Sequence, residues 1–260
     1  WHQLSLVLIN FLDNKSNQRD NNYYELYKGF ISLFSNKLNP LQYVTIVSIV
    51  GHSFNDHLES LNYFEDLIKS NSALSEEAKI CLQMDVVIVL LKLGKLIDAQ
   101  NLLETNGDIL FKLQSIDSLV FSKYYKSLSE CYKLKGPAHE YHKAALMYIT
   151  YTNIDKLSSE DKYELATDIA LAAISGEGIY NFGEVIATPI LKSLLNTPNA
   201  WLYDLIYALN NGDVDTFNKT IELNKSVYFN SPALVSQHES IKQKVVLLSL
   251  INIAFERSPN

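Results

Sequence analysis

The chain has 260 residues, 47% of them hydrophobic, which is enough to bury sizeable cores in one or two domains. Its 29 acidic residues outnumber the 22 lysines and arginines, and the resulting net charge of −7 argues against a protein that binds nucleic acid through concentrated basic charge. The longest strictly apolar runs fall far short of the roughly 20 residues that span a bilayer, so we expect a soluble protein.

The N-terminal segments have the pattern of helices. Trp1 lies in an apparent helix with the sequence HQLSLVLINFL, and Tyr23, Tyr24 and Tyr27 follow at helical spacing. At such spacing an amphipathic ring packs its body and leaves its hydroxyl in water. We therefore expect most of the tyrosines to line the core or grooves.

Prolines mark helix starts along the chain. Five of the six follow a capping-type residue and precede an apolar pattern at helical spacing: Asn39-Pro40, Gly136-Pro137, Thr188-Pro189, Thr197-Pro198 and Ser231-Pro232. Proline is tolerated at the first helical position because its missing N–H would have had no partner there. Ser75, Ser158 and Asp213 predict three further starts.

The middle of the chain predicts stacked pairs of helices. Apolar residues recur at helical spacing, and no convincing strand alternation is found. In the clearest pair, Leu91–Glu104, small Ala99 stands where the second helix of a tetratricopeptide-like pair approaches the first. Cys81 and Cys131 have no CxxC partner, so we expect packed, reduced thiols of an intracellular protein. The pattern predicts an all-α, right-handed solenoid of antiparallel helix pairs.

Two pairs of residues raise the question of a metal site. His139 and His142 are three residues apart, whereas the zinc signature HExxH needs them four apart. They can share a helix face, but no third ligand is identifiable, so a solvated helix start is the better interpretation. His238-Glu239 has Lys242 where the motif needs histidine, and predicts a polar helix face. We expect no catalytic residue, no metal and no cofactor.

A glycine-rich segment, GEGIYNFG, follows a helical run. It departs from the nucleotide-binding pattern GxGxxG and does not follow a strand, so we expect a turn between helices. The residues of this turn are Gly176, Gly178, Asn181, Phe182 and Gly183. Glycine relaxes the backbone there, and Tyr180 and Phe182 are expected to pack back onto the helices. The segment also leaves open a partner-facing knob.

Two features near the C-terminus concern contacts. Tyr228 and Phe229 fall in an expected loop and are our candidate partner-binding residues, because aromatic rings concentrate in binding hot spots. Ile241–Arg257 is apolar on almost every side, and the helix that it predicts needs neighbours all round.

Several of these features together resemble one family. They are GEGIYNFGE, Pro189, Trp201-Leu202, the turn Asn211-Gly212-Asp213, His238-Glu239 before the apolar helix, and a second island, LYKGFISLFSNKLNPLQYV, at Leu26–Val44. On these residues the chain resembles the non-ATPase regulatory subunit 13 family of the 26S proteasome lid, a member of the PCI group. The likeness is strongest over Tyr163–Arg257 and fades between the two islands.

The resemblance implies a helical-repeat region over residues 1–157 and the helical half of a PCI module over residues 158–260. In the family a winged helix follows, and it is missing here; since the chain also starts inside an apparent helix without an initiating Met, we expect a piece of a longer protein.

The resemblance also implies a function. It is that of a non-catalytic scaffold of the proteasome regulatory particle lid, which supports lid assembly and ubiquitin-dependent protein degradation. The partners would be other lid subunits, chiefly PCI-domain neighbours, in a cytoplasmic and nuclear hetero-oligomer without nucleic acid or membrane. Two alternatives stay open. One is a helical-repeat adaptor of the COP9 signalosome or of translation initiation factor three, and the other is a small hydrolase, which requires a pocket with converging titratable groups.

Overall fold

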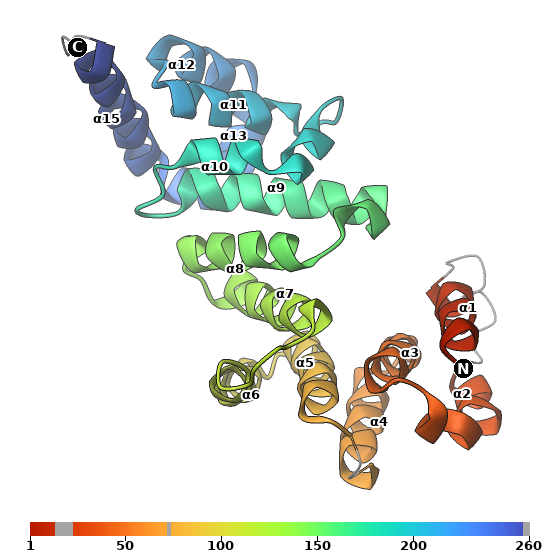
Figure 1. Ribbon diagram of the computed structural model, residues 1–260. Coiled ribbons are helices and arrows are strands. Elements are labelled where there is room, and N and C mark those ends of the chain that lie inside the picture. The colour runs from red at the N-terminus through yellow and green to blue at the C-terminus, as the bar shows by residue number, and fades with distance from the viewer. Residues whose placement is uncertain (14–22, 72–73, 257–260) are drawn as a thin grey trace. The chain divides into compact units, whose positions relative to one another are not determined.

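The computed structural model describes residues 1–13, 23–71 and 74–256 (Figure 1). Within these ranges every regular element is a helix and there is no strand, so the predicted all-α class is confirmed. The chain divides into two compact units, Trp1–Cys131 and Tyr132–Asn260. Each unit has its own hydrophobic core. The division that we expect at residues 157 and 158 concerns the start of a PCI module, and it stays a prediction.

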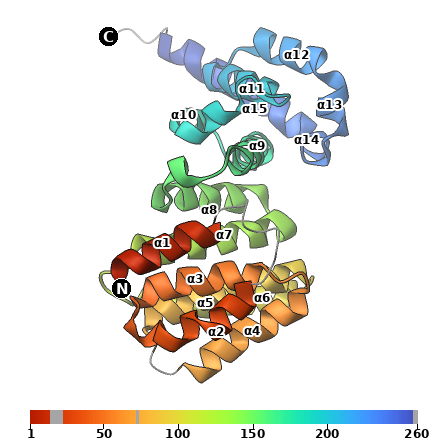
Figure 2. The same ribbon diagram turned by 90° about the vertical axis from the view of Figure 1, so that its right-hand side faces the viewer.

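The first unit is a stack of helices around α5. Its elements are α1 (His2–Asp13), α2 (Tyr23–Gly29), the 3-10 helix η2 (Ile31–Lys37), α3 (Pro40–His52), α4 (His57–Ser70), α5 (Glu76–Lys92), α6 (Leu96–Leu110) and the greater part of α7 (Ser118–Lys135). α5 packs against α3, α4 and α6, which surround it in Figure 2, and most of its residues are buried. A helix that is apolar on all sides is stable only with such neighbours.

A tight turn reverses the chain between α5 and α6. Gly94 adopts a φ of 74°, and the N–H of Lys95 donates to the carbonyl of Leu90 at 2.9 Å. Ala99 is fully buried, and its small side chain lets α6 pack closely on α5. The antiparallel pair expected at Leu91–Glu104 is therefore present.

The second unit packs around α9 and α11. Its elements after the end of α7 are α8 (Ala138–Tyr151), η3 (Ile154–Lys156), α9 (Ser159–Ser175), α10 (Phe182–Ala187), η4 (Pro189–Leu194), α11 (Ala200–Asn211), α12 (Val214–Leu223), α13 (Lys225–Asn230), α14 (Pro232–Ser236) and α15 (His238–Glu256). α8 and α9 lie side by side, and α11 packs against α9, α12 and α15 (Figure 1).

Capping side chains account for several helix starts. The side chains of Asn39, Ser75, Ser158 and Asp213 each accept a hydrogen bond from a backbone N–H in the first turn, as predicted. Each cap satisfies a donor that has no partner within the helix. Local sequence therefore determines where these four helices begin.

The proline rule holds only in part. Pro40 and Pro232 occupy the first positions of α-helices, and Pro189 begins a 3-10 helix. It is wrong at Pro137, which is itself the cap residue of α8, and at Pro198, which precedes the cap residue of α11. At both places the helix begins later than the proline signal predicts.

Candidate functional site

The glycine-rich segment connects α9 to α10. Residues 176–181 form the connection, and Gly178 has a φ of 74°, where an L side chain is strained. The side-chain oxygen of Asn181 accepts a hydrogen bond from the backbone N–H of Glu184 at 3.3 Å. Asn181 thus caps α10, and the segment is a turn between two helices.

The two aromatic residues of this segment behave differently. Phe182 is fully buried in the core of the second unit, whereas Tyr180 is 46% exposed. The expectation that Tyr180 packs back onto the helices is therefore wrong. Tyr180 lies within the turn, whereas Phe182 is the first residue of α10 and packs into the core.

A buried lysine fixes the turn from a distant part of the chain. Lys244 of α15 is 2% exposed, and its Nζ donates to the carbonyl oxygens of Ile174 at 2.9 Å and Gly176 at 2.5 Å. The Nζ atom also lies 5.9 Å from the centroid of the Phe182 ring. The carbonyls that end a helix carry partial negative charge, so they suit a cation. Burial lowers the pKa of Lys244 to about 8.

The candidate partner-binding pair lies in helix α13, not in the loop that we expect. Tyr228 is fully buried, and its hydroxyl lies 2.9 Å from Nδ1 of His238. Tyr228 therefore belongs to the core and is wrongly assigned as a surface contact. Phe229 is 44% exposed and keeps the accessibility that a contact residue needs.

The two histidines near the start of α8 do not form a solvated pair. His142 is only 7% exposed, and its Nε2 has no hydrogen-bond partner among the residues that the structure describes. Burial, assisted by the charge of Lys244, lowers the pKa of His142 to about 4. In the described part of the chain, no three His, Cys, Asp or Glu side chains are grouped so that they could hold a metal ion.

The first unit contains a buried polar cluster that the sequence pattern does not reveal. Asp85 accepts hydrogen bonds from Ser48 at 2.5 Å and Lys123 at 2.6 Å, and it lies 3.1 Å from His52. Burial alone raises the pKa of Asp85, but Lys123 and His52 outweigh it and hold the pKa at about 2. Ser48 and His52 belong to α3, Asp85 to α5 and Lys123 to α7, so one carboxylate links the three helices.

α15 presents an apolar face that the described residues do not cover. Ile241 and Val245 are buried, whereas the following apolar side chains are between 43% and 58% exposed: Val246, Leu247, Leu250, Ile251 and Ile253. The prediction that this helix has neighbours all round is therefore wrong for the described residues. Among all the residues that the structure describes, no helix is long and apolar enough to cross a bilayer.

Comparisons with known proteins agree on one family. The sequence profile described as "PSD13 N-terminal repeats" matches residues 1–206. The "26S proteasome non-ATPase regulatory subunit 13 homolog B" of Arabidopsis thaliana is 31% identical, over 99% of this chain and 68% of the relative. The "26S proteasome non-ATPase regulatory subunit 13" of Dictyostelium discoideum is 30% identical, over 100% of this chain and 68% of the relative. The "Probable 26S proteasome regulatory subunit rpn9" of Schizosaccharomyces pombe is also 30% identical, over 100% and 66% respectively.

Proposed function

This chain belongs to the family of the 26S proteasome non-ATPase regulatory subunit 13, and we propose that it is a non-catalytic scaffold subunit of the regulatory particle lid. In this role it binds other lid subunits, chiefly PCI-domain neighbours, and supports lid assembly and ubiquitin-dependent degradation in the cytoplasm and nucleus. The match to regulatory subunits over 99% to 100% of the chain carries the proposal. Stacked helix pairs support it, since such stacks offer long surfaces to partners.

The proposal is tested by affinity purification. The tagged protein, expressed in the cells that it comes from, should retrieve proteasome lid subunits in stoichiometric amounts when the eluate is quantified by mass spectrometry. Retrieval of signalosome or initiation-factor subunits in their place would contradict the assignment to the lid. Hydrolase activity in the purified chain would contradict the non-catalytic role.

The same experiment tests Phe229 as a contact residue. Phe229→Ala should reduce retention of lid subunits several-fold, because an aromatic anchor at an interface is often worth 1 kcal/mol or more. Leu223→Ala is the matched control, since Leu223 is 76% exposed on the nearby helix α12. Equal retention of the Phe229 and Leu223 variants would remove Phe229 from the interface.

A further inference from the structure

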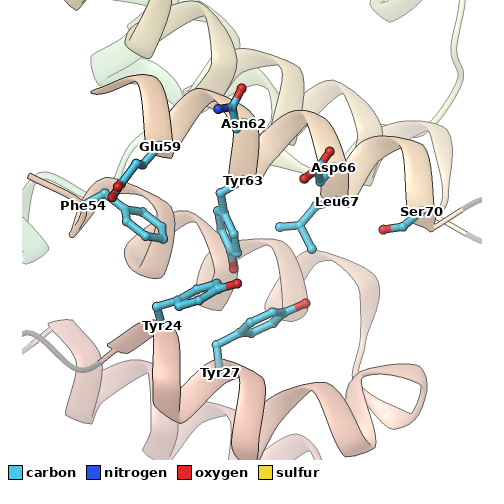
Figure 3. Close-up of a pocket in the computed structure, with 9 residues that line it drawn as sticks. All are labelled: Tyr24, Tyr27, Phe54, Glu59, Asn62, Tyr63, Asp66, Leu67 and Ser70. Carbon is cyan, nitrogen blue, oxygen red and sulfur yellow. The ribbon is translucent and has the colours of Figure 1, made fainter. Parts of the chain in front are cut away.

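The first unit contains an aromatic pocket between α2, α4 and the segment that joins α3 to α4 (Figure 3). Its volume is about 530 Å³, and its walls are formed by Tyr24 and Tyr27 of α2, Phe54, and Tyr63 of α4. The centroid of Tyr63 lies 6.0 Å from that of Tyr24 and 5.7 Å from that of Tyr27, and both pairs meet edge to face. Phe54 closes the side at 5.4 Å from Tyr63. Such a group of rings offers π-faces to a cation.

The charge of the pocket is one-sided. Glu59 and Asp66 lie on the same face of α4, on either side of Tyr63, and Figure 3 shows both at the rim above the rings. They are two helical turns apart, a rise of about 10 Å. None of the described residues that line the pocket is basic. Neither carboxylate forms a salt bridge within the described residues, whereas Glu65 of the same helix pairs with Lys69 at 3.0 Å.

Tyr63 contributes its ring to the pocket. Its hydroxyl is buried, has no hydrogen-bond partner among the described residues, and in Figure 3 points toward the rings of Tyr24 and Tyr27. Burial raises the pKa of Tyr63, so the group stays neutral and adds no negative charge to the pocket. Tyr24 is 40% exposed and stands at the entrance.

We propose that this pocket binds an arginine side chain presented by a partner protein. A planar guanidinium stacks on the exposed ring of Tyr24, and its N–H groups face the acidic rim that Glu59 and Asp66 form together. Lysine matches this set less well, because its ammonium is a compact, strongly hydrated charge without a flat face. The proposal rests on the first unit alone and is independent of the assignment to the proteasome, so either can fail without the other.

The experiment titrates the protein with an acetylated and amidated pentapeptide, Gly-Ser-Arg-Ser-Gly, and follows the aromatic and amide NMR signals of the first unit. We expect saturable shifts confined to the pocket with a Kd roughly in the millimolar range, since one side chain supplies only about 4 kcal/mol. The matched peptide carries citrulline, which keeps the shape of arginine and removes its charge. It should bind at least about fivefold more weakly, the fold-change that corresponds to about 1 kcal/mol of lost cation–π and charge interaction.

Variants locate the binding site. Tyr24→Ala and Asp66→Asn should each raise the Kd of the arginine peptide several-fold. Glu65→Gln is the control, because Glu65 carries the same charge one residue from Asp66 but lies outside the pocket. Circular dichroism checks that each variant is folded, and Asp66→Asn is an exposed change that keeps the test valid if an aromatic variant unfolds. The proposal is overturned if the citrulline peptide binds equally, if Glu65→Gln weakens binding as much as Asp66→Asn, or if no saturable shift occurs.

Discussion

At the scale of single residues, buried ionisable groups determine how stability depends on pH. Asp85 has compensating partners, Lys123 and His52. Lys244 is held by carbonyl oxygens of α9, and His142 is buried with an Nε2 that no described residue pairs with. Of these, His142 makes stability depend on pH just below neutrality. Burial favours its neutral ring, so protonation of the ring at low pH favours the unfolded chain.

Replacing His142 tests this dependence. In the unfolded chain its pKa returns to the ordinary value of 6.5, whereas in the folded chain it is about 4, so the unfolded state binds more protons between these values. Stability is therefore fully present above pH 6.5 and is lost as the pH falls toward 4, by on the order of 2 to 3 kcal/mol. Urea denaturation followed by Trp201 fluorescence should show this loss in the unchanged protein and a flatter profile in His142→Leu. Parallel profiles for the two proteins would contradict the assignment.

At the scale of elements, local chemistry predicts helix starts and turns, and tertiary contacts explain the rest. The caps at Ser158 and Asp213 need only a side chain and an N–H three residues on, so sequence suffices. The local sequence does not predict the burial of Tyr228, because that burial depends on contacts with Trp201 and His238, which belong to other helices.

The candidate sites follow the same rule. Lys244 differs from Lys242 only in what it meets in space, and no local pattern reveals that. The pocket of the first unit was predictable only as far as Tyr24 and Tyr27 line a groove, because Tyr63 and Phe54 come from later segments.

Two glycines of the second unit separate backbone strain from crowding. Gly178 and Gly212 both have positive φ, 74° and 60°, but an added Cβ meets nothing within 4 Å at Gly178. At Gly212 it would lie 2.5 Å from the backbone nitrogen of Ser249 in α15. Gly178→Ala should cost about 1 to 2 kcal/mol, the strain of the left-handed conformation alone.

Gly212→Ala should cost clearly more, because α15 must move away from α11. Equilibrium urea unfolding, followed by Trp201 fluorescence, measures both free energies in the same unit. Equal losses in the two variants would mean that α15 shifts at no cost, and that its packing on α11 is looser than the described contacts indicate.

At the scale of the whole molecule, the chain contains two separate cores, and each contains a fully buried phenylalanine. Phe64 belongs to the core of the first unit, and Phe182 to the core of the second. Truncating either ring to alanine should cost about 3 to 5 kcal/mol, because the loss of buried apolar surface is followed by an unfilled cavity. The two variants are therefore matched in chemistry and differ only in the unit that they weaken.

Native-state hydrogen exchange shows where each loss is felt. If each core unfolds as a cooperative unit, Phe64→Ala should speed exchange at least about 100-fold in the most protected amides of residues 23–71 and 74–131, and leave those of residues 132–256 unchanged. Phe182→Ala should do the reverse. Leu223→Ala is the control: Leu223 is 76% exposed, and its loss should change stability by no more than about 0.5 kcal/mol. Faster exchange in both units from either variant would mean that the two cores unfold together. In that case the loss in one core lowers the free energy of a single unfolding transition, and the amides of both units exchange through that transition.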